Sequence, residues 1–436
     1  MSVGDYILQL LQAGWMGLLD YLAAHVLLCL VPAFFIAGYL SGLMPKGVIT
    51  RYLGPRTPKY ISYPAAAAGG FLLAVCSCTI LPLFAGIWKR GAGLGPAITF
   101  LFVGPAVNIL AISYTGAAIG MDIALARIVL SIAFGITIGL IMAALFKQPQ
   151  AAPVSSDLFQ DDSAMRPALW VFFGLLLAVL VAGTLQIDLL TGTLFTVRLP
   201  VDVPIQPALD ALNLTLQGAL LIVLLVIIAP VAWKGLNDVL NGFNRWTWAS
   251  LALVALTLLL AAPSTESGSI VIHFTGRFVA EALLLAAIVY VAARHLERDE
   301  LAGWLAETWR FVKQIFPLLI VGVFAAGVVR ALIPEDWIRT LAGQNTIGAN
   351  LLAVTFGVFM YFPTLVEVPI ARMFLDLGMN RGPLLAYLLS DPELSLQSIL
   401  VTGKILGRRK TATYVGLVAV FSTLAGYLFG LFLAQV

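Results

Sequence analysis

The chain carries ten apolar segments, each close to the length that an α-helix needs to cross a lipid bilayer. About 20 apolar residues span the roughly 30 Å of hydrocarbon in a membrane. Only 11% of the 436 residues are charged and 61% are hydrophobic, so charge is too scarce to cover a soluble surface. A transmembrane β-barrel would instead show short segments of alternating polarity. The pattern predicts an all-α polytopic membrane protein. The ten segments are 21–43, 95–118, 123–146, 168–186, 208–232, 247–263, 276–293, 311–332, 382–403 and 411–434.

Lysine and arginine indicate which loops face the cytoplasm, because cytoplasmic loops are enriched in both. The loops 44–60 and 403–411 each hold four basic residues and no acidic one. The loops near 187–207 and 333–347 are slightly acidic, so we expect them outside. This assignment places both ends of the chain outside.

Two further apolar segments, 61–88 and 348–374, cannot be added as ordinary crossings. Only one net crossing fits between the cytoplasmic loop 44–60 and the outer turn near Asp122, yet two apolar segments lie there. The second half of the chain has the same conflict. We therefore predict that 61–88 and 348–374 are re-entrant hairpins, which enter and leave the membrane on one side.

Two parts of the chain are related by a repeat with a spacing of 287 residues. Because proline and glycine interrupt helices, shared positions of both predict shared breaks. The charge pattern starts the first copy outside and the second inside, which is the inverted-topology repeat of secondary transporters. The matching residues are Pro82, Gly91, Gly95, Pro96 and Pro105 in the first copy, and Pro369, Gly378, Gly382, Pro383 and Pro392 in the second.

The predicted organisation has five parts. An interfacial segment at 1–20 precedes the first transport repeat at 21–146, and a polar cytoplasmic linker follows at 147–167. A central four-helix block at 168–310 separates this repeat from the second, inverted one at 311–436. No motif for nucleotide hydrolysis, proteolysis or dinucleotide binding occurs, so we expect a transporter without a cofactor. No basic stripe favours nucleic acid.

Polar residues at the predicted helix breaks are candidates for a substrate site. Cys76 and Cys78 flank one residue, and in an extended backbone residues i and i+2 project to the same side. Thiolates select soft ligands, and Cys29 is a candidate third sulfur. Alternatively, these free cysteines are small buried apolar residues. The other candidates at the breaks are Thr79, Asn108, Tyr361 and Thr364.

Three acidic residues, Glu367, Asp391 and Glu393, are predicted near mid-depth. A charged side chain at the bilayer centre costs roughly 2.5–3.5 kcal/mol on insertion scales, so such acids are candidate proton carriers. The structural alternative is that Asp391 caps a half-helix whose first residue is Pro392. We expect Arg127 to snorkel at an outer helix end. Arg372, five residues after Glu367, is a candidate partner for it.

Several motifs resemble those of the bacterial ArsP-type permeases. They are the run from Cys76 to Pro82, the glycines and proline from Gly91 to Pro96, the stretch from Gly104 to Asn108, and a degenerate second copy from Phe362 to Pro369. The resemblance covers both repeats and is weak over 147–310. It implies an efflux permease for trivalent organoarsenicals such as methylarsenite and reduced aromatic arsenicals, with Cys76 and Cys78 as the matching positions for transient arsenic ligation.

The leading hypothesis is therefore an organoarsenical exporter of the bacterial cytoplasmic membrane. Because no ATP site is visible, we expect proton antiport, with Glu367 or Glu393 as carrier. A permease of the same fold for an inorganic anion or a sulfur compound is the alternative. A membrane redox or assembly protein that uses Cys76 and Cys78 is a third hypothesis. The expected partners are the arsenical, protons and lipid, and the sequence leaves the oligomeric state open.

Overall fold

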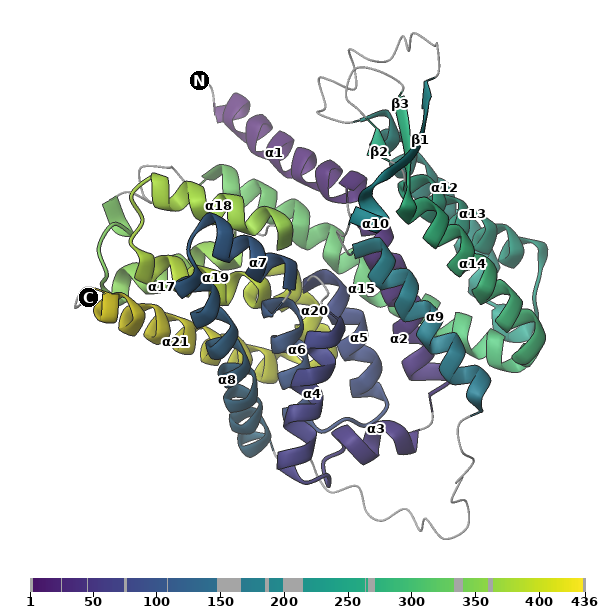
Figure 1. The fold of residues 1–436 in the computed structure, drawn as a ribbon, viewed down its shortest axis with the longest axis horizontal. Helices are drawn as coiled ribbons and strands as arrows, with labels where there is room; N and C mark the ends of the chain where they lie inside the picture. The colour runs from purple at the N-terminus through teal and green to yellow at the C-terminus, as the bar shows by residue number, and fades with distance from the viewer. Residues whose placement is uncertain are drawn as a thin grey trace. The chain divides into compact units, whose positions relative to one another are not determined.

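A computed structural model of the chain confirms the all-α polytopic class. In the part of the chain that the structure describes, five helices are long and apolar enough to cross a membrane, and several shorter apolar helices accompany them (Figure 1). Those five candidate spans are Met121–Leu145, Gln217–Leu236, Gly276–His295, Arg298–Val328 and Arg408–Phe432. The structure describes residues 3–24, 26–44, 46–73, 77–107, 109–146, 166–184, 188–198, 215–262, 264–265, 271–332, 340–359 and 364–433.

The chain divides into two compact units. Unit 1 comprises Met1–Trp15, Lys46–Ser163 and Pro317–Val436, and unit 2 comprises Met16–Pro45 and Ala164–Phe316. The division falls inside two helices, α1 (Val3–Ala24) and α15 (Arg298–Leu332). Unit 1 thus contains most of both predicted repeats. The helix that follows α1 lies in unit 2, together with the central block.

Unit 1 is built from two copies of one five-helix pattern. A shift of 287 residues carries the first residue of α5 onto that of α18, and does the same for α6 and α19, α7 and α20, and α8 and α21. The repeat inferred from prolines and glycines is therefore a repeat of whole helices. The first copy is α4 (Lys59–Leu73), α5 (Ser77–Lys89), α6 (Leu94–Ala106), α7 (Ile109–Ala118) and α8 (Met121–Leu145). The second copy is α17 (Ile347–Phe359), α18 (Thr364–Asp376), α19 (Arg381–Leu394), α20 (Leu396–Leu406) and α21 (Arg408–Leu433). A short helix, α3 (Lys46–Leu53), precedes the first copy.

Four helices of each copy are too short to cross a bilayer alone. The helices α4 to α7 have 15, 13, 13 and 10 residues, which at 1.5 Å per residue gives about 15–22 Å. The fifth helix of each copy has 25 or 26 residues and is long enough. The breaks that the sequence predicted in 95–118 and 382–403 are present, since α6 ends at Ala106 and α19 at Leu394. Their orientation to the membrane stays a prediction.

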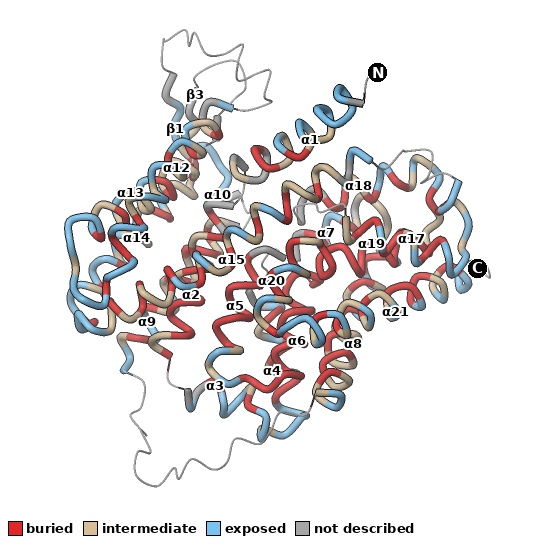
Figure 2. Tube along the Cα trace, turned by 180° about the vertical axis from the view of Figure 1, so that it is seen from behind, coloured by how far each residue is buried: buried red, intermediate tan, exposed pale blue. Residues whose placement is uncertain are grey.

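The two most deeply buried helices of unit 1 are the repeat-related α6 and α19 (Figure 2). Each packs between two helices of its own copy, α4 and α8 or α17 and α21. Glycines allow the close approach: a Cβ on Gly139 would lie 2.6 Å from the Gly95 carbonyl, and one on Gly426 would lie 2.5 Å from that of Gly382. Small residues at helix contacts let backbones meet in the same way in other membrane proteins.

The reversal before each of these helices also repeats. Gly91 has φ +96° and Gly378 has φ +94°, a left-handed conformation that glycine adopts without a Cβ clash. The hairpins α5–α6 and α18–α19 therefore turn in the same way.

The predicted break at Asp391 and Pro392 is wrong by one helical turn. Both residues lie inside α19, which continues to Leu394. The next helix is instead capped by Ser395, whose Oγ accepts a hydrogen bond from the Ser398 amide at 3.3 Å. Asp391 is therefore not an N-cap.

Unit 2 contains the four helices expected of the central block, together with α2 (Val26–Gly42) and the first part of α15. Within it, the Tyr39 hydroxyl donates to the Leu169 carbonyl at 2.8 Å, and the Trp304 indole donates to the Phe35 carbonyl at 2.8 Å. The block helices are α9 (Pro167–Thr184), α12 (Leu216–Leu236), α13 (Arg245–Ala261) and α14 (Gly276–His295), with short turns α10 (Asp188–Thr191) and η1 (Val239–Asn241).

A small antiparallel sheet in unit 2 was not expected from the sequence. Its strand order is β1–β3–β2, with Thr196 opposite His273 and Ser264 on the other side of His273. The strands are β1 (Thr193–Arg198), β2 (Ser264–Thr265) and β3 (Val271–Thr275). They connect the helices and leave the helical class unchanged.

Candidate functional site

The three candidate acids all lie buried in the second copy of the repeat. Glu367 is in the first turn of α18, and Asp391 and Glu393 are in the last turn of α19. Their exposed fractions are 1%, 2% and 4%. An acidic residue in the first turn of a helix is stabilised by the macrodipole, which accounts in part for Glu367.

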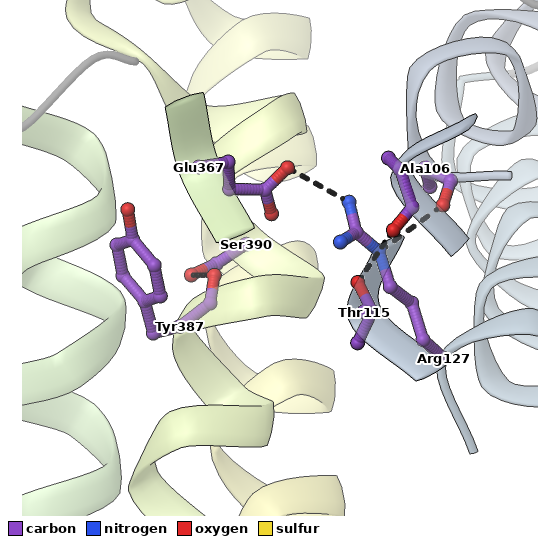
Figure 3. Close-up of polar contacts among 7 residues, drawn as sticks. Ala106, Thr115, Arg127, Glu367, Tyr387 and Ser390 are labelled. Atoms are coloured by element: carbon purple, nitrogen blue, oxygen red, sulfur yellow. Dashed lines mark hydrogen bonds and ion pairs between the residues drawn. The ribbon is translucent and has the colours of Figure 1, made fainter. Parts of the chain in front are cut away.

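Arg127 of α8 is the ionic partner of Glu367, and it comes from the first copy. The Arg127 Nη2 atom lies 3.0 Å from Glu367 Oε2, and the arginine is fully buried (Figure 3). Its Nε donates to the Ala106 carbonyl at 3.3 Å. The expectation that Arg127 snorkels at a helix end is therefore wrong. A guanidinium can remain buried because a carboxylate and a free carbonyl at the end of α6 share its charge.

Arg372, the partner suggested by sequence spacing, does not pair with Glu367 in the structure. It pairs with Asp376 one turn later, at 3.2 Å, and donates to the Ala118 carbonyl at 3.2 Å. Residues five apart on a helix do not face each other, whereas residues four apart do.

The partner of Glu393 is Tyr414 of α21, whose hydroxyl donates to Glu393 Oε2 at 2.9 Å. The shift of 287 residues relates Tyr414 to Arg127, and Glu393 to Ala106. Each copy therefore has a long polar side chain on its full-length helix, and that side chain reaches the end of the neighbouring half-helix. In the first copy it reaches a backbone carbonyl, and in the second a carboxyl group.

The acids have apolar counterparts in the first copy. Glu367 and Asp391 correspond to Ile80 and Gly104, and a Cβ on Gly104 would lie 2.7 Å from the Ile80 side chain. Likewise the backbone contact of Gly70 with Gly104 recurs as a close contact of Gly357 with Asp391. The fold thus places equivalent positions together in both copies, and only the second copy fills them with carboxyl groups.

The cluster holds more carboxyl groups than its one arginine neutralises. Asp391 and Glu393 both lie within electrostatic range of Arg127 and Glu367. Burying an unpaired polar atom costs about 1–3 kcal/mol, so native proteins contain few of them. Proton uptake by the additional carboxyls would remove unpaired buried charge. In Arg127 and the three acids, the buried atoms without a hydrogen-bond partner among the described residues are Arg127 Nη1, Glu367 Oε1, Asp391 Oδ1 and Glu393 Oε1.

The described residues offer no group of three histidine, cysteine or acidic side chains with the spacing of a metal site. The three acids instead lie on two helices, and Glu367 and Glu393 have different partners, Arg127 and Tyr414.

Most of the candidate substrate residues lie where the structure gives no side-chain position. Cys76, Asn108 and Tyr361 are outside the described residues, and for Cys29, Cys78 and Thr364 only the helical backbone is described. Thr79 is fully buried in α5. Because α5 begins at Ser77, the extended backbone expected of the cysteine pair does not reach Cys78. Whether the thiols meet the acids stays a prediction.

Arg127 and Tyr414 are the two site residues that the sequence analysis missed. The sequence did contain a signal for both residues. The 287-residue shift carries Arg127 onto Tyr414, and both are polar residues in otherwise apolar helices. Their contacts, however, join residues 240 and 21 positions apart in the chain, which the sequence does not reveal.

A polytopic helical fold made of two copies of broken helices, with buried acids between them, is the architecture of a membrane permease. The chain belongs to the ArsP_1 family, described as predicted permeases, whose profile matches residues 13–431. It is 37% identical over 434 residues to the UPF0718 protein MJ0584 of Methanocaldococcus jannaschii, covering 99% of both chains. It is 25% identical over 209 residues to the UPF0718 protein YraQ of Escherichia coli, covering 46% of this chain and 57% of that one. No solved structure matches.

Proposed function

We propose that this permease exports trivalent organoarsenicals, such as methylarsenite and reduced aromatic arsenicals, across the cytoplasmic membrane in exchange for protons. Membership of a predicted permease family supports the transport role. The observation that carries the coupling is the buried cluster of Glu367, Asp391 and Glu393 around Arg127.

The thiol pair supports a soft, thiophilic substrate. Cys76 immediately precedes α5 and Cys78 is its second residue, at the break that the sequence predicts in the first copy. Thiolates select soft species, and a small neutral arsenical has no charge to lose on entering lipid. Contact with a site on a conduction path must be weak enough to permit release, so we expect one thiol contact or exchange between the two.

The carboxyl cluster supports protons as the coupling ion. An unpaired charge in apolar surroundings is costly, and a bound proton removes it. Glu367 and Glu393 are the proposed carriers, because each has one oxygen held by a partner and one without a partner among the described residues. Asp391 adds a third carboxyl between them in the chain.

The test of the substrate is uptake of methylarsenite into everted membrane vesicles, with and without a proton gradient. We expect accumulation that needs the gradient and is lost in the variant Cys76→Ser/Cys78→Ser, because serine keeps the size of cysteine and removes the soft ligand. The reduction should be at least about tenfold, which corresponds to about 1.4 kcal/mol.

The variant Ser77→Ala is the matched control, since it alters the same run and leaves both thiols. It should transport like the native protein. Undiminished methylarsenite uptake by the double cysteine variant would refute the thiol site. Uptake of a sulfur oxyanion in place of the arsenical would assign the permease to another small solute.

A further inference from the structure

On one side of the contact between the two copies of unit 1, charged side chains of one copy bond to the other copy. We call this surface the polar seam. It joins the end of α7 and the start of α8 to α18 and α19. Besides the buried Arg127–Glu367 pair, Arg381 Nη2 lies 2.9 Å from Asp122 Oδ1, and Arg372 donates to the Ala118 carbonyl. The seam residues are Ala118, Asp122 and Arg127 of the first copy, and Glu367, Arg372 and Arg381 of the second.

At the repeat-related surface the counterparts of Glu367, Arg372 and Arg381 cannot form these ion pairs. The shift of 287 residues carries Glu367, Arg372 and Arg381 onto Ile80, Ala85 and Leu94, which cannot form ion pairs. The counterparts of these three charged residues are therefore apolar, and the repeat-related surface instead carries a cation–π contact, with Lys410 Nζ 5.4 Å from the centre of the Trp88 ring. In transporters built from repeats, alternating access comes from one repeat rocking against the other. The ion pairs make the polar seam a contact that a proton can open or close.

We propose that Arg127 is the positioning residue for coupling: it holds Glu367 while that carboxylate is charged and so keeps the polar seam closed, and a proton on Glu367 releases it. The proposal rests on the proposed proton-coupled function and names the residue and the contact through which it acts.

Arg127 suits the role of the fixed partner. Its Nε bond to the Ala106 carbonyl ties it to the end of α6, in its own copy, whatever Glu367 does. The carbonyl end of a helix carries partial negative charge, which favours a cation there. A guanidinium stays protonated in proteins, so the proton that arrives must bind the carboxyl. The step converts a carboxylate and a proton into a neutral carboxylic acid, and the ion pair is lost.

Other charged groups around Glu367 make the Arg127–Glu367 ion pair sensitive to protonation. Asp391 and Glu393 on α19 repel its negative charge, and Tyr414 on α21 binds Glu393. On its own helix, Arg372 and Asp376 neutralise each other. From α7 the titratable residue is Tyr114, which is exposed. Arg127 is thus the one cation that faces Glu367 from a packed helix in the described part of unit 1.

The test measures the seam itself and needs no arsenical. In the full-length chain with its three cysteines changed to serine, Asp122→Cys/Arg381→Cys provides two thiols across the exposed part of the seam. A short bifunctional thiol reagent is applied at one fixed pH. Adding Glu367→Gln, which mimics the protonated acid, should slow cross-linking about tenfold, within the range typical of coupled sites. Glu307→Gln in α15, outside the seam, should leave the rate unchanged.

A second measurement guards against misfolding of the Glu367→Gln variant. Spin labels on the same two cysteines should lose their dipolar broadening as pH falls, in protein that keeps the native Arg127 and Glu367. Arg127→Lys, which retains a cation with fewer donors, should shift this transition toward higher pH. Equal cross-linking with Glu367 and with glutamine, together with pH-independent broadening, would overturn the proposal. Seam opening without methylarsenite uptake would instead overturn the arsenical substrate and leave this proposal standing.

Discussion

Replacing Arg127 with methionine will destabilise the folded protein by about 3–5 kcal/mol, because removing one partner of a buried ion pair leaves an uncompensated charge. Arg127 and Glu367 are 0% and 1% exposed and lie 3.0 Å apart. Glu367→Met should be as harmful, since it leaves the guanidinium facing Asp391 and Glu393 without its direct bond. The free energy of unfolding is measured by titration from mild detergent into sodium dodecyl sulfate, followed by circular dichroism.

The double variant Arg127→Met/Glu367→Met should recover most of this loss, because apolar residues of similar volume can replace a buried pair at little cost. It should nevertheless show no proton-driven uptake, which separates the fold from the coupling. Asp122→Asn is the matched control: it breaks an ion pair between the same copies, at 40% exposure on both sides, where about 0–1 kcal/mol is expected. Additive losses in the double variant would contradict a direct pair between the two residues.

Gly426→Val will be the most damaging change among the helix contacts, at about 1–3 kcal/mol or more. A Cβ at this position would lie 2.5 Å from the Gly382 carbonyl and would also collide with the Asn350 side chain. A backbone carbonyl inside α19 cannot move aside, so α21 would have to shift away from the most buried helix of its copy. Thermal unfolding in detergent, followed by light scattering, reports the loss.

Gly416→Val is the control in the same helix, because nothing lies within 4 Å of a Cβ there. It should be close to neutral. Gly139→Val, the repeat-related change in α8, should be as harmful as Gly426→Val, since its Cβ would lie 2.6 Å from the Gly95 carbonyl. If Gly426→Val and Gly416→Val melt at the same temperature, the close packing of α19 on α21 is wrong.

The helix breaks could be predicted from the sequence because they are local. Proline and glycine act on the backbone within one or two turns of where they stand, and the 287-residue spacing made each break a paired observation. The limit of this local reasoning is Pro392, where the helix continued for two residues beyond the proline. Proline limits where a helix can run, but the capping side chain of Ser395 decides where the next one begins.

Local sequence features also predicted the acidic residues of the candidate site but not their partner Arg127. Glu367, Asp391 and Glu393 stood out because acids are rare in apolar segments. Arg127 was expected at a helix end because it lies five residues after Asp122. It is indeed close to the start of α8 in the sequence, but its side chain is fully buried in the structure. One face of the start of α8 contacts α6 and α18, so the Arg127 side chain is buried although Leu125 on another face is 55% exposed.

The sequence by itself determined the membrane class, the helical breaks and the repeat, since hydrophobicity, proline and glycine express themselves over short stretches of chain. Only the tertiary structure decided which charges meet. The Arg127–Glu367 and Arg381–Asp122 bonds join residues 240 and 259 positions apart, and nothing in their neighbours specifies the partner. Packing of two similar copies against each other brought them together.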